Sequence, residues 1–309
     1  MHIFSGITRN GFSTNGAILT SLLLGMWGAP AAAAESASAV SQGMGGTVRA
    51  NPWDPMTAHA APGMVWLDGR FELGASGRYG NDETSLWQVG AYDAQTTRVG
   101  FGVFWSRLTQ SIEPKNAELP GWRREDQEFD NYIRSSVLST TIGGGGIHRL
   151  FGFGVGVRYF YRSTKLGGSE HALTLAPSIA TVIQDSVIVS ITAENVIPTG
   201  NPDAPLGMST GTRWQISRQL ALAFDTEVDF ESVEDKVAFT PMVGAEFRAG
   251  DVVPLRAGWR RDGVDGTRWL TGGIGVENES VGLSYGLSLD LNSGDEAVHQ
   301  HGVMLRISM

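Results

Sequence analysis

The chain has 309 residues, of which 41% are hydrophobic, and a formal net charge of −9. This acidic balance offers no basic surface for nucleic acid, so no nucleic-acid partner is expected. The sequence contains no cysteine, which excludes a disulfide framework, a thiolate metal site and a lipid-anchored N-terminal cysteine.

The first segment of the chain, residues 1–34, is predicted to be a secretory signal peptide. A polar start with Arg9 precedes the apolar run 17–27, and an alanine-rich tract follows. This order of regions is typical of a cleaved export signal. We expect cleavage after Ala34, with Ala39 as the second choice. A single anchoring helix is the alternative, but the apolar run is shorter than a membrane-spanning helix requires.

Residues 35–63 show no strand alternation and are rich in glycine and proline. A flexible periplasmic tail is one interpretation. Such a tail has no use for large apolar side chains, yet this segment contains Met44, Trp53 and Met56, with Asp54 between them. We therefore predict a compact plug, or hatch, in the mouth of a barrel, with these four residues as candidates for ligand gating.

From residue 64 to residue 309 the chain alternates between apolar and polar or small residues. Residues 281–292 are the clearest case, with Val281, Leu283 and Tyr285 on one face and glycine or serine on the other. Successive side chains of a strand leave opposite faces, so this pattern predicts strands with one apolar face. Fourteen such runs are expected: 64–78, 84–93, 96–106, 135–148, 151–163, 170–183, 185–195, 207–216, 218–230, 237–249, 251–261, 266–277, 279–291 and 298–309.

The connections between these runs alternate in length. Those after even-numbered runs are short, and those after odd-numbered runs are mostly longer and more polar, such as 107–134. Short periplasmic turns and longer external loops are typical of outer-membrane proteins. The fold class is therefore predicted as all-β, an antiparallel transmembrane β-barrel of about 14 strands spanning 64–309, with an N-terminal luminal hatch. A soluble periplasmic β-protein is the alternative, and it would purify without detergent.

The membrane placement implies outer-membrane lipid as a partner, and the barrel-assembly machinery as another. The alternation continues to Met309, as in bacterial outer-membrane proteins whose last strand that machinery reads. Trp87, Trp105, Trp214 and Trp259 lie near expected strand ends, where an interfacial aromatic girdle would place them.

The faces opposite the apolar ones carry charges of both signs, and these faces would line the lumen. Charges in such an enclosed site need partners, so a structural ion-pair network is expected, with a selective ion path as the alternative. The candidate members are Arg70, Glu72, Arg158, Arg162, Asp225, Glu227, Asp229, Arg256 and Arg260.

Two short places resemble a known family. One is the Gly-x-Gly-Gly run 43–46, followed by Asp54 and by a Pro62-Gly63 turn before the first strand. The other is the late-strand pair 253–260 and 270–276. Together they resemble the FadL-type long-chain fatty-acid transporters, including the PorV/PorQ-like branch.

This resemblance implies fourteen strands, a luminal hatch and passive passage of hydrophobic or amphipathic small molecules, without a cofactor. Trp122, in the long loop 107–134, joins the candidate gating residues because this loop could fold over the barrel mouth. The PorV-like branch implies an alternative role, a scaffold or secretion-accessory barrel that binds exported proteins through its external loops.

Nothing in the sequence indicates an enzyme. No local signature supports a Ser-His-acid hydrolase. His299 and His301 share one face, but a third metal ligand is close in sequence only as Asp295 or Glu296, so no metal site is predicted. The glycine run 143–146 lacks the Lys-Ser/Thr of a phosphate loop, and we expect it to give room for the hatch or for a kink.

Overall fold

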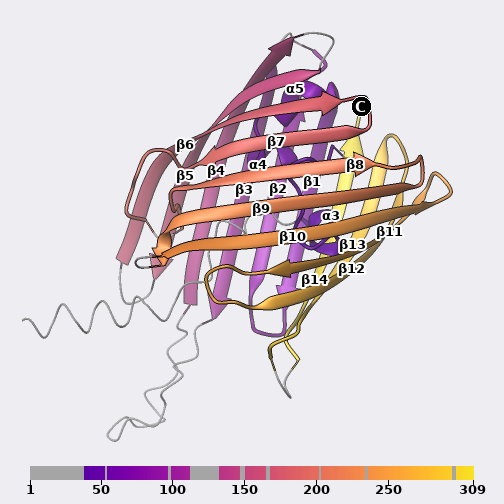
Figure 1. Ribbon diagram of the computed structural model, residues 1–309. Coiled ribbons are helices and arrows are strands. Elements are labelled where there is room, and N and C mark those ends of the chain that lie inside the picture. Colours follow the sequence, from indigo (N-terminus) through magenta and orange to yellow (C-terminus); the bar gives the residue numbers. More distant parts are fainter. Residues whose placement is uncertain are drawn as a thin grey trace, which may run out of the picture.

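The computed structural model describes residues 38–309, except 53, 97–98, 112–131, 147–149, 165–167, 202, 234–235 and 294–296. In this part of the chain fourteen strands form a closed barrel, each antiparallel to its neighbours, with β1 paired to both β2 and β14 (Figure 1). The predicted fold class is confirmed. Among the described residues no helix is both long and apolar enough to span a bilayer. The expected signal peptide lies outside them.

The strands follow one another around the wall in chain order. Their bounds are β1 Phe71–Gly80, β2 Ser85–Asp93, β3 Gly100–Ser111, β4 Tyr132–Gly146, β5 Phe151–Thr164, β6 Gly168–Ile183, β7 Val187–Glu194, β8 Gly207–Gln215, β9 Leu220–Val233, β10 Lys236–Ala249, β11 Val253–Arg261, β12 Arg268–Glu277, β13 Val281–Asp290 and β14 His299–Ser308.

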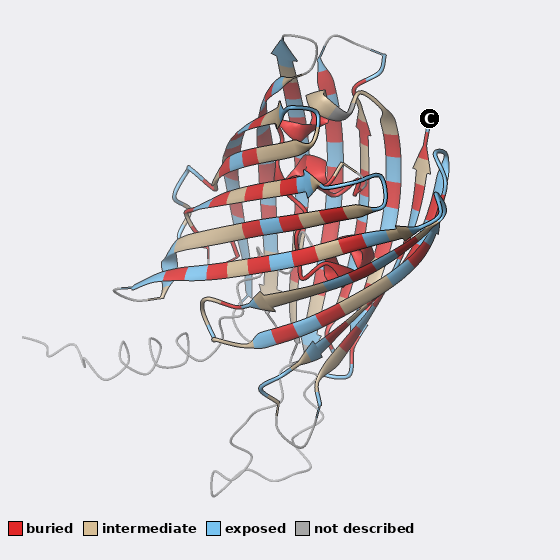
Figure 2. Cartoon of the chain, turned by 45° about the vertical axis from the view of Figure 1, so that its right-hand side comes forward, coloured by how far each residue is buried: buried red, intermediate tan, exposed pale blue. Residues whose placement is uncertain are grey.

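Burial alternates residue by residue along the wall, so buried and exposed bands cross each strand (Figure 2). In β13, Val281 and Leu283 are exposed on the outer face, whereas Ser284 and Ser288 are buried on the inner one. A continuous belt of exposed large apolar side chains surrounds the barrel, which suits hydrocarbon far better than water.

Three prolines lie inside strands, and each lies near the end of a ladder. Pro177 directly precedes Ser178, where the described pairing of β6 with β7 begins. Pro241 directly precedes Met242, where β10 starts to pair with β11. Pro254 is the second residue of β11. Proline has no N–H to donate, so these positions cost the fewest ladder hydrogen bonds.

The expected start of the barrel at residue 64 is wrong. Residues Met64–Asp68 form a short helix, α5, and β1 begins only at Phe71. Gly69, in a left-handed conformation with φ 66°, ends this helix and turns the chain into the wall. Trp105 is also misplaced in the prediction, because β3 continues to Ser111 and leaves this ring in mid-strand.

The hatch segment lies inside the barrel. Its helices are α3 Ala39–Gly43, α4 Thr57–Ala60 and α5, all three seen within the wall in Figure 1. Helix α3 contacts β11–β14 and β1, α4 contacts β3 and β4, and α5 contacts β3–β6. The N-terminal segment therefore fills the lumen between opposite sides of the wall.

Candidate functional site: the luminal hatch and its charge network

The hatch faces β2–β4 mainly with apolar side chains. Val48, Met56 and Ala60 form a fully buried cluster with Phe104 of β3. The His59 ring stacks on Phe104 with centroids 4.1 Å apart and an interplanar angle of 13°. A second cluster joins Ala58 and Val65 to Tyr92 and Ala94. Burial, together with the charges of Arg158 and Arg49, lowers the pKa of His59, so a neutral ring makes this contact.

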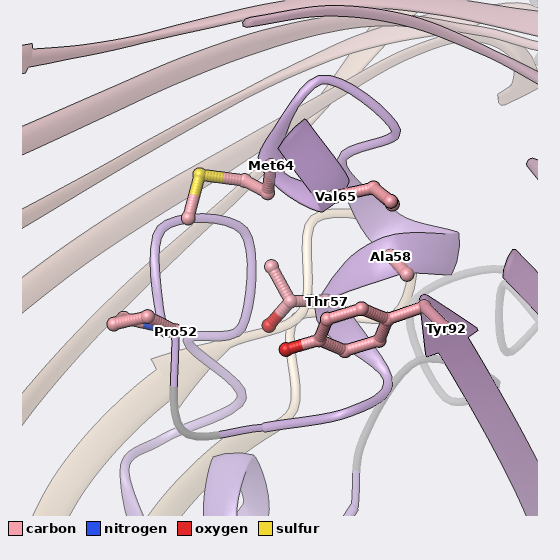
Figure 3. Close-up of a pocket in the computed structure, with 6 residues that line it drawn as sticks. All are labelled: Pro52, Thr57, Ala58, Met64, Val65 and Tyr92. Carbon is pink, nitrogen blue, oxygen red and sulfur yellow. The ribbon is translucent and has the colours of Figure 1, made fainter. Parts of the chain in front are cut away.

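A small cavity lies on this apolar side (Figure 3). Its lining residues come from the hatch and from β2: Pro52, Thr57, Ala58, Met64, Val65 and Tyr92. The cavity holds about one water-sized sphere, far less than the several hundred Å³ of a small-molecule site. This cavity is therefore too small to hold a hydrophobic solute while the hatch stays in place.

Glycines on the inner face let the hatch backbone approach the wall closely. A Cβ added at Gly258 would lie 2.3 Å from the Met44 carbonyl carbon, and one at Gly154 would lie 2.4 Å from the Pro62 carbonyl. Within the run 143–146, a Cβ on Gly143 would meet the Pro62 carbonyl oxygen at 3.0 Å. The glycine run thus makes room for the hatch.

Polar ties hold the hatch to β7–β14. The backbone N–H groups of Val48 and Arg49 both donate to Asp225 Oδ2 at 2.9 Å. Gln42 Nε2 donates to Ser288 Oγ at 3.1 Å, and Gly45 N donates to Thr271 Oγ1 at 2.9 Å. These bonds satisfy hatch backbone and side-chain groups that have no regular secondary-structure partner.

Arg49 is the main charged link between hatch and wall. Its guanidinium forms a salt bridge with Glu227, lies 3.5 Å from Glu194 and lies 3.9 Å from Asp225. Burial alone would lower the pKa of Arg49, but the three carboxylates outweigh it and hold this pKa above its ordinary value. Arg158 also bridges to Glu194, and its Nη2 donates to the His59 carbonyl at 2.8 Å.

A second network lies in the wall of β8 and β10–β12. Glu246 accepts from Arg213 and from Arg256, each at 2.9 Å. Arg256 also reaches Glu277 at 2.6 Å, and Arg248 lies within 3.4 Å of Glu246 and Glu277. The buried carboxylates thus each meet more than one cation, as buried charge requires.

The other predicted network residues have separate partners. Glu72 pairs with Arg306 at 3.2 Å, and Arg162 lies 3.7 Å from Asp203. Arg260 lies over the Trp269 ring at 5.7 Å. Asp229 accepts from the backbone N–H groups of Glu231 and Ser232 in the same strand, β9. For Arg70, the backbone carbonyl rather than the charged group accepts from Ala94 N at 3.0 Å. The predicted charges therefore form several clusters rather than one ring.

Asp54 joins the middle of the hatch to the start of α3. Its Oδ2 accepts from Ser38 Oγ at 2.5 Å and its Oδ1 from Met56 N at 3.0 Å. Ser38 is the N-cap of α3, where its Oγ accepts from Val40 N and Ser41 N. Burial raises the pKa of Asp54 to about 6, although the bonds from Ser38 and Met56 act in the opposite direction.

The predicted gating residues are placed in part. Met44, Asp54 and Met56 are fully buried in the hatch. Trp53 and Trp122 lie outside the described residues. Sequence reasoning missed Arg49 as the central cation. Its signal was that Arg49 is the one lysine or arginine of residues 35–63, a segment rich in glycine, proline and apolar residues.

Three solved structures share this architecture. The toluene transporter TbuX of Ralstonia pickettii matches with a TM-score of 0.66 at 14% identity, over 89% of this chain and 98% of its own. CymD, a monoaromatic hydrocarbon channel, gives 0.61 at 13% identity over 88% and 96%. The deltaS2 mutant of the monoaromatic hydrocarbon channel TodX gives 0.60 at 15% over 89% and 98%.

The chain has the fold of these channels. The fourteen-stranded barrel expected from the resemblance to FadL-type proteins is thereby confirmed. The scaffold role implied by the PorV-like branch stays a prediction. No family model matches the chain, and no curated protein matches its sequence.

Proposed function

We propose that this protein lets hydrophobic or amphipathic small molecules pass passively across the outer membrane. The observation that carries this proposal is the asymmetry of the hatch. Toward β7–β12 it is held by charges and hydrogen bonds, whereas toward β2–β4 it is held mainly by apolar contacts around the small cavity, with one hydrogen bond from Thr141 Oγ1 to the Ala58 carbonyl. A hydrophobic solute would pass between the hatch and β2–β4, because it can replace the apolar contacts there but cannot replace ion pairs.

The membrane placement is part of the same proposal. The belt of exposed apolar side chains faces outer-membrane lipid, and the barrel-assembly machinery inserts the chain. Outer-facing rings mark both rims of the belt, with Trp87 beside the β1–β2 connection and Trp214 beside the β8–β9 turn. Heat-modifiable gel migration of the membrane-extracted protein tests this placement. A protein that purifies without detergent would contradict it.

A reversible lock on the hatch tests transport directly. A Cβ at Gly102 of β3 would lie 3.6 Å from the Ala58 Cβ of α4, which matches the separation in a disulfide. The chain has no cysteine of its own, so A58C/G102C forms no other intramolecular pair. We expect cells that carry the oxidised variant to take up the fluorescent probe N-phenylnaphthylamine at the background rate. Reduction should restore the uptake.

The matched control is G156C/A176C. A Cβ at Gly156 would lie 3.8 Å from the Ala176 Cβ, but this pair joins β5 and β6, which are already hydrogen-bonded neighbours. Oxidation of the control should leave uptake unchanged. If the oxidised A58C/G102C variant takes up the probe as fast as its reduced form, the proposal that solutes pass along β2–β4 is wrong.

A further inference from the structure

Two arginines face each other on the outside of the barrel. Arg261 is the last residue of β11, Arg268 is the first residue of β12, and the register places them directly opposite. Both are exposed, and strand alternation puts them on the outer face with Leu255 and Leu270. Like charges directly opposite each other on neighbouring strands are destabilising.

The connection between them carries Asp262 and Asp265, but in the described part of the chain neither carboxylate lies within salt-bridge distance of Arg261 or Arg268. Neither arginine takes part in an ion pair there. The outward positions of β10–β13 also carry no aspartate or glutamate. This is notable in a chain with a net charge of −9. The position therefore calls for an anion from outside the chain.

The surroundings of the arginine pair indicate which anion fits. One step toward the middle of the strands, Trp259 pairs with Leu270, and Leu289 lies opposite Leu270 on β13. The arginines therefore cap an apolar surface. They flank the β11–β12 connection, at the rim that carries the longer, external connections. A ligand there needs a negative head and an apolar body.

The same rim continues as a polar and aromatic edge on β13, β14 and β1. The His299 and His301 rings, at the start of β14, meet edge-on at 5.1 Å, and His301 Nδ1 lies 2.6 Å from Oη of Tyr285, which comes from the middle of β13. Tyr79 of β1, opposite His301, is 60% exposed. Such rings are typical of the headgroup level of a membrane.

We propose that Arg261 and Arg268 clamp a phosphate of an outer-leaflet glycolipid of the lipid A type. Each guanidinium offers a planar fork that matches phosphate oxygens, and the phosphate removes the repulsion between the two cations. The acyl chains lie on the apolar strip of Trp259, Leu270 and Leu289 below. This inference requires the barrel to lie in the outer membrane, but it does not depend on transport.

Lipid A binding to the detergent-purified protein, followed by native mass spectrometry, tests the proposal. Each arginine at a lipid surface contributes about a fivefold gain in binding, so R261Q/R268Q should bind about 30-fold more weakly. The control is R218Q, which removes an exposed arginine from the β8–β9 turn at the opposite rim. It should bind lipid A like the wild type.

Two further measurements distinguish a lipid phosphate from free phosphate and show whether the variants fold. Lipid A stripped of its phosphates should bind the wild type as weakly as intact lipid A binds the double variant. Heat-modifiable migration reports folding, and if the double variant fails to fold, each single variant should still show about a fivefold loss. Unchanged affinity in the folded variants would overturn the proposal. So would inorganic phosphate that competes as well as phosphorylated lipid.

Discussion

Replacing Arg49 by methionine should loosen the hatch without opening the barrel wall. Loss of one partner from a buried ion pair costs about 3–5 kcal/mol, because the remaining charge stays buried. Here Glu194 keeps Arg158, and Asp225 keeps two backbone N–H donors, but the bridge from Arg49 to Glu227 is lost. We therefore expect the substitution to destabilise the seated hatch by an amount near the lower limit of this range, about 3 kcal/mol.

Hydrogen exchange of the hatch amides measures this cost. A loss of about 3 kcal/mol lowers the protection of the amides of residues 48 and 49, both of which donate to Asp225, by about 140-fold. Amides of the wall strands should keep their protection, since their ladder bonds are unchanged.

The control substitution is Arg248→Met. Arg248 belongs to the wall network, and its partners Glu246 and Glu277 are both also held by Arg256. This variant should leave hatch protection unchanged. If the Arg49 variant retains wild-type hatch protection, or if the Arg248 variant loses as much, the hatch is not held by the Arg49 cluster and this reasoning is refuted.

Two more predictions concern hatch packing and its pH dependence. Gly258→Ala should lower the free energy of unfolding in detergent by about 1–3 kcal/mol, because the added Cβ would lie 2.3 Å from the Met44 backbone. Gly272→Ala, whose Cβ would lie 3.8 Å from its nearest atom, should leave the free energy unchanged in the same denaturant titration. The folded pKa of Asp54, about 6, lies above its ordinary 3.8, so the folded hatch binds this proton more tightly and loses stability as pH rises from about 4 to about 6. Hatch amide protection factors should fall over this window in the wild type and fall less in Asp54→Asn, most clearly at the Met56 amide that donates to Asp54; an equal fall in both would contradict the assignment.

The wall was predictable because its signal is local. In a strand such as β13, apolar and polar residues alternate over the length of the strand itself. Val281 and Ser284 could therefore be assigned to opposite faces without knowing which strands lie beside β13. The error at residues 64–68 has the same origin. Met64 and Trp66 fit a strand alternation, but burial against β3–β6 and the turn at Gly69 favour a helical turn instead.

The site was predictable only in its parts. Burial of Met44 and Met56 followed from their apolar side chains in a segment without strands. The partners of Glu72, 234 residues away in sequence at Arg306, and of Asp225, at Arg49, depend on how the sheet closes. No periodic pattern in the sequence predicts such contacts, since each is made by a single pair of side chains.

The amino-acid sequence by itself determined the number of strands, the faces they turn outward and the presence of a non-strand segment before them. Those properties arise from the chemistry of consecutive residues, so they can be inferred from the sequence of each strand separately. The tertiary structure decided which charges meet, where glycines let the hatch touch the wall, and that two arginines stand opposite each other at the rim. These depend on register and closure, which bring together residues that no local pattern connects.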